Sequence, residues 1–231
     1  MIDIRGLAFN YGTSGGDGKS AFGLRIDTFN VPAGASAALV GPSGSGKTTL
    51  LGLIAGTLRP SSGNIIVNDQ IITGFSDRTL GAFRIHNIGQ VFQTFELLSY
   101  LSVIENVMLP WFITGEGRAN EIRDRATELL SNVGLNSKAR SRPDELSQGE
   151  QQRVAVCRAI LNQPSILLAD EPTGNLDQQN KQNVVDLLRE QARTNDSTLL
   201  MVTHDESLLA RFDLVFDIRN IVTSTGSKIL Q

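Results

Sequence analysis

The chain has a single cysteine, no long uninterrupted apolar run and no strong excess of either charge. Its one cysteine, Cys157, excludes an internal disulfide and is typical of a reducing compartment such as the cytoplasm. The net charge of −3 disfavours nucleic acid as a partner, because proteins that neutralise nucleic-acid phosphates are usually basic. These features favour a cytoplasmic protein that does not bind nucleic acid.

No segment of the sequence predicts a membrane span or a secretion signal. The longest apolar stretch, residues 97–115, contains Glu105, Asn106 and Pro110, which do not suit a membrane-spanning helix. Residues 1–5 lack the basic-then-apolar layout of a signal peptide. A role at a membrane would therefore require docking onto another chain. The 231 residues, 40% of them apolar, are enough for one large α/β domain or two small ones.

The glycine-rich residues 41–49 predict a phosphate-binding loop. They follow an apolar run at 37–40, which predicts a buried strand, and precede an apolar run at 50–55, which predicts a helix. Strand, glycine loop and helix are the context that the G-x-x-x-x-G-K-[ST] pattern requires. The backbone N–H groups of such a loop and of the helix N-terminus point at an anion. The candidate nucleotide-binding residues are Gly41, Pro42, Ser43, Gly44, Ser45, Gly46, Lys47, Thr48 and Thr49.

Two side chains of this loop have specific chemical roles. Lys47 supplies a positive charge for the β- and γ-phosphates of a nucleotide, and the Thr48 hydroxyl can bind Mg²⁺. The alternative, a solvent loop that is rich in glycine by chance, is disfavoured by the strand and helix on either side.

The order of predicted elements indicates an α/β fold. Residues 1–10 and 22–31 alternate in hydrophobicity, which predicts two strands, and the glycine- and serine-rich residues 13–19 predict a loop between them. Early strands followed by alternating strands and helices predict a mixed sheet beside a parallel one. The predicted strands that follow are 37–40, 64–67, 88–93, 166–169 and 198–203, and the clearest predicted helices are 119–133, 148–162 and 178–193.

Two adjacent acids, Asp170 and Glu171, follow the apolar run 166–169. Ligands of open α/β sheets collect at the carboxyl ends of the strands. Because adjacent strand residues face opposite ways, we expect the two acids to have different roles. Asp170 would hold Mg²⁺ through a water, and Glu171 would orient and deprotonate the attacking water. Alone the pattern also fits a strand that ends in an acidic turn, but the phosphate loop upstream favours the functional interpretation.

A second candidate anion site lies at residues 146–153. Ser147 and Glu150 have the S-x-x-E spacing of a capping box, which predicts that a helix begins here. The N-terminus of a helix that carries a serine and the small Gly149 can bind an anion. Because the first loop already binds the phosphates, two such sites suggest two copies that meet head-to-tail around each nucleotide. The alternative is an ordinary capped surface helix.

Over nearly the whole chain, these motifs resemble those of the ATP-binding cassette (ABC) ATPases. Residues 41–49 look like the Walker A motif, 166–171 like Walker B and 146–150 like the family signature. Gln93 stands where the family has its Q-loop glutamine, and His204 matches the switch histidine. Residues 175–177 match the D-loop, and Tyr11 matches the aromatic residue that stacks on adenine. The sequences around 106–110, 149–153 and 170–177 are similar to the macrolide-exporter, lipoprotein-release and cell-division branch.

The resemblance implies a fold and a set of roles. The fold is a P-loop NTPase of the ABC type, one domain over residues 1–231, with a mixed sheet core, an antiparallel β subdomain and an inserted helical subdomain at about 94–162. The cofactors are ATP and Mg²⁺. The implied catalytic residues are Glu171, His204 and Gln93, and the implied Mg²⁺ ligands are Thr48, Gln93 and Asp170. Besides Tyr11 and the loop residues, the implied ATP contacts are Ser147, Gln148, Gly149, Glu150 and Asp177, which would act across the dimer.

The chain departs from the family pattern at Gln148, where branch members usually have a glycine. The larger side chain would face the γ-phosphate bound by the partner, so we expect weaker ATP-driven closure of the dimer. Asp69 and Gln70 also replace the glycine turn that is usual after Val67.

The function implied is an ATPase that forms a homodimer and powers a separate membrane permease from the inner face of the cell membrane. The permease would export its cargo or extract a lipoprotein, lipid or peptide. The alternative is an ATPase that drives a non-transport mechanotransmission complex through a membrane partner. A nucleic-acid-associated ABC protein and a small-molecule kinase are disfavoured. Some of six apolar residues after Gln93 are expected to dock the partner: Leu97, Leu98, Tyr100, Leu101, Val103 and Ile104.

Overall fold

The computed structural model describes residues 1–11, 23–174 and 176–223. The predicted loop at 13–19 and Asn175 of the D-loop match lie outside the described residues. Among the helices that are described, none is long and apolar enough to cross a bilayer.

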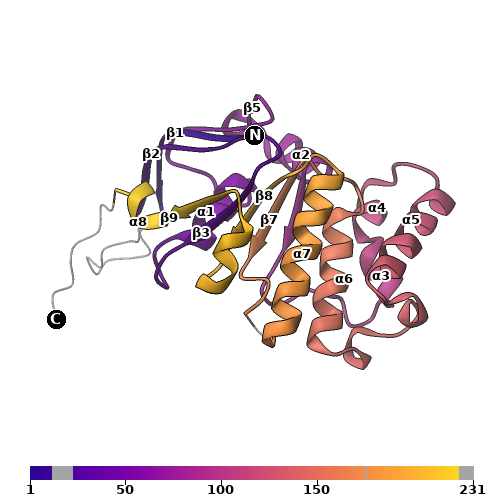
Figure 1. Cartoon of the computed structure of the whole chain (residues 1–231). Helices are drawn as coiled ribbons and strands as arrows, with labels where there is room; N and C mark the ends of the chain where they lie inside the picture. The colour runs from indigo at the N-terminus through magenta and orange to yellow at the C-terminus, as the bar shows by residue number, and fades with distance from the viewer. Residues whose placement is uncertain (12–22, 175, 224–231) are drawn as a thin grey trace, which may run out of the picture.

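An antiparallel sheet forms the first part of the chain (Figure 1). Its strand order is β2-β1-β4-β5, and residues of β2 alternate between buried and exposed, as expected for a sheet with one solvated face. Asn68 and Asp69 join β4 to β5 with φ angles of 49° and 63°. Asn and Asp tolerate this left-handed conformation, so the turn forms without the usual glycine. The strands are β1 (Ile2–Asn10), β2 (Gly23–Val31), β4 (Ser62–Val67) and β5 (Gln70–Ile71).

A second, parallel sheet carries the predicted site at its carboxyl edge. Its order is β6-β7-β8-β3-β9, and every neighbouring pair is parallel. The predicted α/β architecture is therefore confirmed, although within the described residues the antiparallel and parallel strands form separate sheets and not one mixed sheet. The strands are β3 (Ser36–Val40), β6 (Ile88–Val91), β7 (Ile166–Asp170), β8 (Thr198–Val202) and β9 (Leu214–Asp217). The predicted strand 88–93 is too long, because Phe92 and Gln93 lie beyond the end of β6.

Helices cover the parallel sheet, and α3 to α6 lie between β6 and β7 in the chain. Figure 1 shows α6 and α7 side by side, with α3, α4 and α5 beyond α6. The sequence pattern does not predict α2, because Leu80 and Phe83 are its only buried residues. The helices are α1 (Lys47–Ile54), α2 (Asp77–Asn87), α3 (Val103–Val107), α4 (Leu109–Thr114), α5 (Ala119–Asn132), α6 (Gln148–Ile160), α7 (Gln178–Thr194) and α8 (Ile218–Ile221). The 3₁₀ helices are η1 (Ile72–Gly74), η2 (Asn136–Lys138), η3 (Pro143–Glu145) and η4 (Glu206–Arg211).

The two faces of the parallel sheet are buried in two different apolar clusters. Along β7, Leu167 and Ala169 pack with the helices α3, α5, α6 and α7, whereas Ile166 and Leu168 pack with α1 and the antiparallel sheet. This alternation follows from the two-residue period of a strand. It places Asp170, the last residue of β7, on the same side as α1 and its preceding loop.

Candidate functional site

The loop before α1 has the backbone conformation that its glycines allow. Gly44 and Gly46 have φ angles of 74° and 99°, a region that residues with a Cβ rarely occupy. A Cβ added to Gly41 would lie 2.4 Å from Cγ2 of Ile218, so a side chain there would collide with α8. The chain thus turns tightly from β3 into α1 and directs the first N–H groups of α1 at one point.

Lys47 fixes the shape of this loop. Its side chain is buried, and its Nζ donates hydrogen bonds to the carbonyl oxygens of Gly41 at 2.8 Å and Pro42 at 2.9 Å. The ammonium group is therefore held at the mouth of the loop, where a phosphate would approach. This is the position expected for the lysine of a phosphate-binding loop.

A cavity of about 500 Å³ opens above the loop. It is lined by most of the predicted site residues, which come from four separate parts of the chain. They are Tyr11, Ser43, Gly44, Gly46, Lys47, Thr48, Thr49, Gln93, Asp170 and Glu171. The loop, the two acids and Gln93 therefore form one site at the carboxyl edge of the parallel sheet, as predicted for an open α/β sheet.

Asp170 lies at this cavity and is partly withdrawn from water. Burial raises the pKa of its carboxyl group, although a hydrogen bond with the Thr48 side chain acts in the opposite direction. Thr48 and Asp170 thus offer two neighbouring oxygen donors of the kind that Mg²⁺ prefers. The described residues contain no cluster of three or more His, Cys, Asp or Glu side chains that could hold a metal. The donor set fits Mg²⁺, which usually binds one or two protein oxygens, phosphates and waters.

Glu171 lies beyond the end of β7, so the alternation of side chains along a strand does not determine its direction. The strand ends at Asp170, and Glu171 has a φ of 44°, so the backbone turns into the left-handed region between the two acids. Its N–H donates to the carbonyl of Val202 at 3.1 Å, which ties the turn to β8. A non-glycine residue in this region is strained and is held there by its surroundings.

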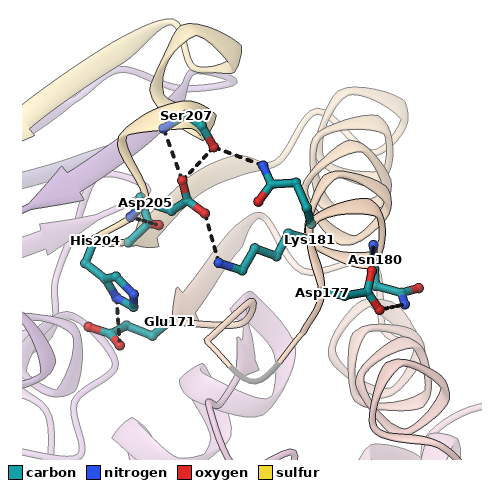
Figure 2. Close-up of polar contacts among 9 residues, drawn as sticks. Glu171, Asp177, Asn180, Lys181, His204, Asp205 and Ser207 are labelled. Carbon is teal, nitrogen blue, oxygen red and sulfur yellow. Dashed lines mark hydrogen bonds and ion pairs between the residues drawn. The ribbon is translucent and has the colours of Figure 1, made fainter.

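His204 contacts Glu171, and Gln93 lines the cavity together with Glu171. Nδ1 of His204 lies 3.3 Å from Oε2 of Glu171, and the imidazole is 61% exposed (Figure 2). Gln93 follows β6, and its Nε2 lies close to Gly174, where an added Cβ would approach it to 3.3 Å. Glu171 and Gln93 therefore line one cavity, and His204 reaches that site through its contact with Glu171.

Tyr11 also lines this cavity. Its ring is 45% exposed and packs edge-on against Phe9, with the ring centroids 4.8 Å apart. Its hydroxyl is 3.3 Å from Oγ1 of Thr49. The ring is thus held in place and still has an accessible surface, as stacking on a flat base requires.

The second predicted anion site lies at the start of α6 and does not line this cavity. Ser147 caps the helix, and Glu150 accepts from the backbone N–H of Ser147 at 2.8 Å, which completes the predicted capping box. Lys138 donates to Glu150 at 2.7 Å and, with the bonds from Ser147, lowers the pKa of Glu150 to about 2. Ser147 and Gln148 are exposed, and Gly149 packs against Asn180. The two sites predicted to bind one nucleotide are thus apart within a single chain.

Asp177 caps α7, and the contacts around it include residues that the sequence motifs do not mark. Oδ1 of Asp177 accepts from the N–H of Asn180 at 3.0 Å, which helps lower the pKa of Asp177. One turn further, Lys181 forms an ion pair with Asp205, the residue after His204 (Figure 2). No sequence signal identifies this pair, because its members are 24 positions apart and belong to no local motif.

Comparison with known proteins identifies the family of this chain. The family model described as ABC transporter matches residues 24–174. The chain is 44% identical over 190 residues to a lipoprotein-releasing system ATP-binding protein from Psychrobacter arcticus, covering 82% of this chain and 84% of the relative. It is 40% identical over 216 residues to a macrolide export ATP-binding/permease protein from Rhodopirellula baltica, covering 93% of this chain and 31% of that longer protein.

Among solved structures, a dimeric ATP-binding cassette in a post-hydrolysis state, bound to ADP and Pi, matches with a TM-score of 0.86. It is 31% identical in sequence, and the match covers 100% of both chains. With a loop, two acids and a glutamine lining one cavity and a histidine in contact with one of the acids, this chain belongs to the ABC transporter family and is one of its ATP-binding ATPases.

Proposed function

We propose that two copies of this chain close head-to-tail around two ATP molecules with Mg²⁺, and that hydrolysis powers a separate membrane permease. The observation that carries this proposal is the exposed start of α6, which lies outside the cavity of its own chain. A nucleotide in that cavity can meet such a helix only if a second copy supplies it. The dimeric state of the solved cassette with ADP and Pi supports this arrangement.

The site residues then have defined tasks. The loop residues 41–49 bind the phosphates, and Tyr11 stacks on the base. Thr48, Gln93 and Asp170 would hold Mg²⁺, which would neutralise phosphate charge. Glu171 accepts a proton from the attacking water, and His204 contacts the γ-phosphate from its place beside Glu171. Ser147, Gln148, Gly149 and Glu150 of the partner, with Asp177 at the seam, complete each site.

The substitution Glu171→Gln tests the catalytic and dimeric parts of this proposal. Removal of a general base costs roughly 10²- to 10⁴-fold in rate. We expect ATP turnover to fall at least about 100-fold, ATP binding to persist, and a closed dimer to accumulate in light scattering with ATP. Glu190→Gln, an exposed carboxylate on α7, is the matched control and should behave like the wild type.

Two results would contradict the proposal. Turnover near the wild-type rate in Glu171→Gln would exclude Glu171 as the base. A Glu171→Gln protein that binds ATP and stays strictly monomeric, even with its membrane partner present, would exclude the head-to-tail dimer.

A groove of about 920 Å³ between α2, α4 and α6 is the proposed docking site for the permease. Ile113 lies at this groove and is 72% exposed. The charged lining consists of three arginines, Arg78, Arg84 and Arg158, and two glutamates, Glu96 and Glu116. We propose that it takes a short permease segment with apolar and acidic side chains.

Of the six apolar residues considered from the sequence, Val103 and Ile104 are buried, Leu98 lines the groove and Tyr100 is 69% exposed. The proposed docking surface thus includes residues of α2 and α4 besides the six considered from the sequence.

The chain would work as a single ABC ATPase domain at the inner face of the cell membrane, with the helical residues 94–162 as the part that contacts the permease. The names of the relatives favour export or lipoprotein release as the task. The alternative is a membrane partner that transmits force without transport. Purifying the chain with its membrane partner separates the two: a partner with a substrate pathway supports transport, and one with a large external domain and no pathway supports mechanotransmission.

A further inference from the structure

The first turn of α7 is tied to the loop that carries His204. Nζ of Lys181 lies 3.0 Å from Oδ2 of Asp205, and both side chains are largely withdrawn from solvent, at 19% and 17% exposure. In the same turn, Nε2 of Gln178 donates to Oγ of Ser207 at 3.3 Å. Figure 2 shows Lys181 reaching across from α7 to the loop after β8.

Asp205 is itself fixed to that loop, so the tie from Lys181 acts on the backbone next to His204. Its Oδ1 accepts from the N–H and the Oγ of Ser207 at 3.1 and 2.6 Å. Its own N–H donates to Oγ1 of Thr203 at 3.1 Å. These bonds hold the Asp205 side chain firmly against the loop, because charge-assisted hydrogen bonds are stronger than neutral ones.

We expect the position of His204 to depend on these bonds of Asp205. Its imidazole is 61% exposed and meets Glu171 at 3.3 Å, so packing does little to fix the ring. The direction of an exposed side chain is set mainly by its backbone. We therefore expect a change at Asp205 to alter the distance between His204 and Glu171.

We propose that Lys181 is a positioning residue, which holds His204 beside Glu171 through Asp205. The inference rests on the roles proposed for Glu171 and His204. It also links the proposed dimer seam to His204. Because α7 begins directly after Asp177, a movement of the seam would reach the loop of His204 through the first turn of this helix.

The chain provides a matched control for this proposal. Arg211, at the end of η4, forms an ion pair with Asp186 further along α7, so it joins the same two elements away from His204. The variants are Lys181→Met, which keeps the apolar stem and removes the charge, Lys181→Arg, which keeps the charge, and Arg211→Met. All three are made in the full chain and checked by thermal unfolding.

We expect Lys181→Met to lower kcat for ATP hydrolysis by about 3- to 30-fold, the range seen for residues that couple sites without touching ligand. KM for ATP should stay within about twofold, since Lys181 does not line the nucleotide cavity. Lys181→Arg should restore most of the rate, and Arg211→Met should keep the wild-type rate. An unchanged kcat in folded Lys181→Met, or an equal loss in Arg211→Met, would overturn the proposal.

A second measurement reports the position of His204 without relying on catalysis. The chain has two histidines, so His86→Asn leaves one imidazole for NMR. In this background, Lys181→Met should shift or broaden the ring signals of His204, and Arg211→Met should not. Identical His204 signals in His86→Asn and in both of its further variants would overturn the proposed positioning role of Lys181. Wild-type turnover in His204→Ala would instead contradict the proposed role of His204, which the NMR result does not address.

Discussion

At the scale of single residues, Glu150 takes part in both the capping box of α6 and an ion pair with η2. Its Oε2 accepts from the backbone and hydroxyl of Ser147 and so begins α6, and its Oε1 pairs with Lys138 of η2. These contacts favour the ionised form, with the bond from Lys138 the largest cause, and lower its pKa to about 2. The start of the signature helix is therefore linked to the protonation of one carboxylate.

We predict that Glu150→Gln lowers the unfolding free energy by about 0.5–1 kcal/mol at pH 7, because glutamine can keep the capping box and loses the charged bond. A depressed pKa adds stability above the ordinary value and loses it as pH falls toward the folded value. The difference from the wild type should therefore shrink between about pH 4.5 and about pH 2. Urea unfolding across this range measures it.

The control for this measurement is Glu121→Gln, which removes an exposed carboxylate paired with Arg118. Such surface pairs contribute little, so its stability should stay near that of the wild type throughout. A Glu150→Gln deficit that was equally large at pH 7 and pH 2 would show that the charge has no part in it.

At the scale of elements, Gly89 lies where β6 packs closely against α6. A Cβ added to Gly89 would lie 2.3 Å from the carbonyl oxygen of Ala159 and 2.7 Å from Cδ2 of Leu167. Backbone atoms cannot move aside as a flexible side chain can. The glycine thus sets the distance between the strand that leads to Gln93 and the helix that begins at the signature.

We predict that Gly89→Ala destabilises the protein by about 1–3 kcal/mol, the usual cost of overpacking a core. Gly81→Ala is the control, since a Cβ there has open space and alanine favours the interior of α2 by up to about 1 kcal/mol. Denaturant unfolding should therefore move the two variants in opposite directions. Equal stability of Gly89→Ala and the wild type would mean that β6 and α6 can separate at no cost.

The elements also show what sequence can and cannot predict. The start of α6 and the loop before α1 are predictable, because a capping box and a phosphate loop are local patterns within a few residues. The helix α2 is not, since only Leu80 and Phe83 are buried and no strong period results. The left-handed φ of Glu171 and the pair Lys181–Asp205 depend on strands and helices distant in sequence, so no local pattern reveals them.

At the scale of the whole molecule, the nucleotide cavity and the groove between α2, α4 and α6 are separate sites with different surfaces. The cavity is lined mainly by polar side chains and glycines, whereas the groove has the exposed apolar Ile113 of α4 beside arginines and glutamates. Two such sites suit a protein that binds a small anion at one and another chain at the other.

We predict that Ile113→Glu reduces the share of the protein that sediments with membranes of its host cells by about tenfold. A buried charge at an interface costs about 1.4 kcal/mol or more, which corresponds to that factor. ATP turnover of the isolated chain should be unchanged, because Ile113 does not line the nucleotide cavity. Ile71→Glu, an exposed apolar side chain on β5 outside the groove, is the control. Equal sedimentation of the two variants would place the docking surface elsewhere.

The two hydrogen bonds from Lys47 to Gly41 and Pro42 have a consequence for experimental design. The lysine acts as an internal brace, so replacing it removes the support of the loop together with the charge meant for phosphate. A loss of function after such a replacement would mix a deformed receptor with a weakened attraction. We expect a replacement of Glu171, which has no hydrogen bond to the carbonyls that Lys47 holds, to leave the loop intact, so it is the cleaner test of the proposed catalytic step.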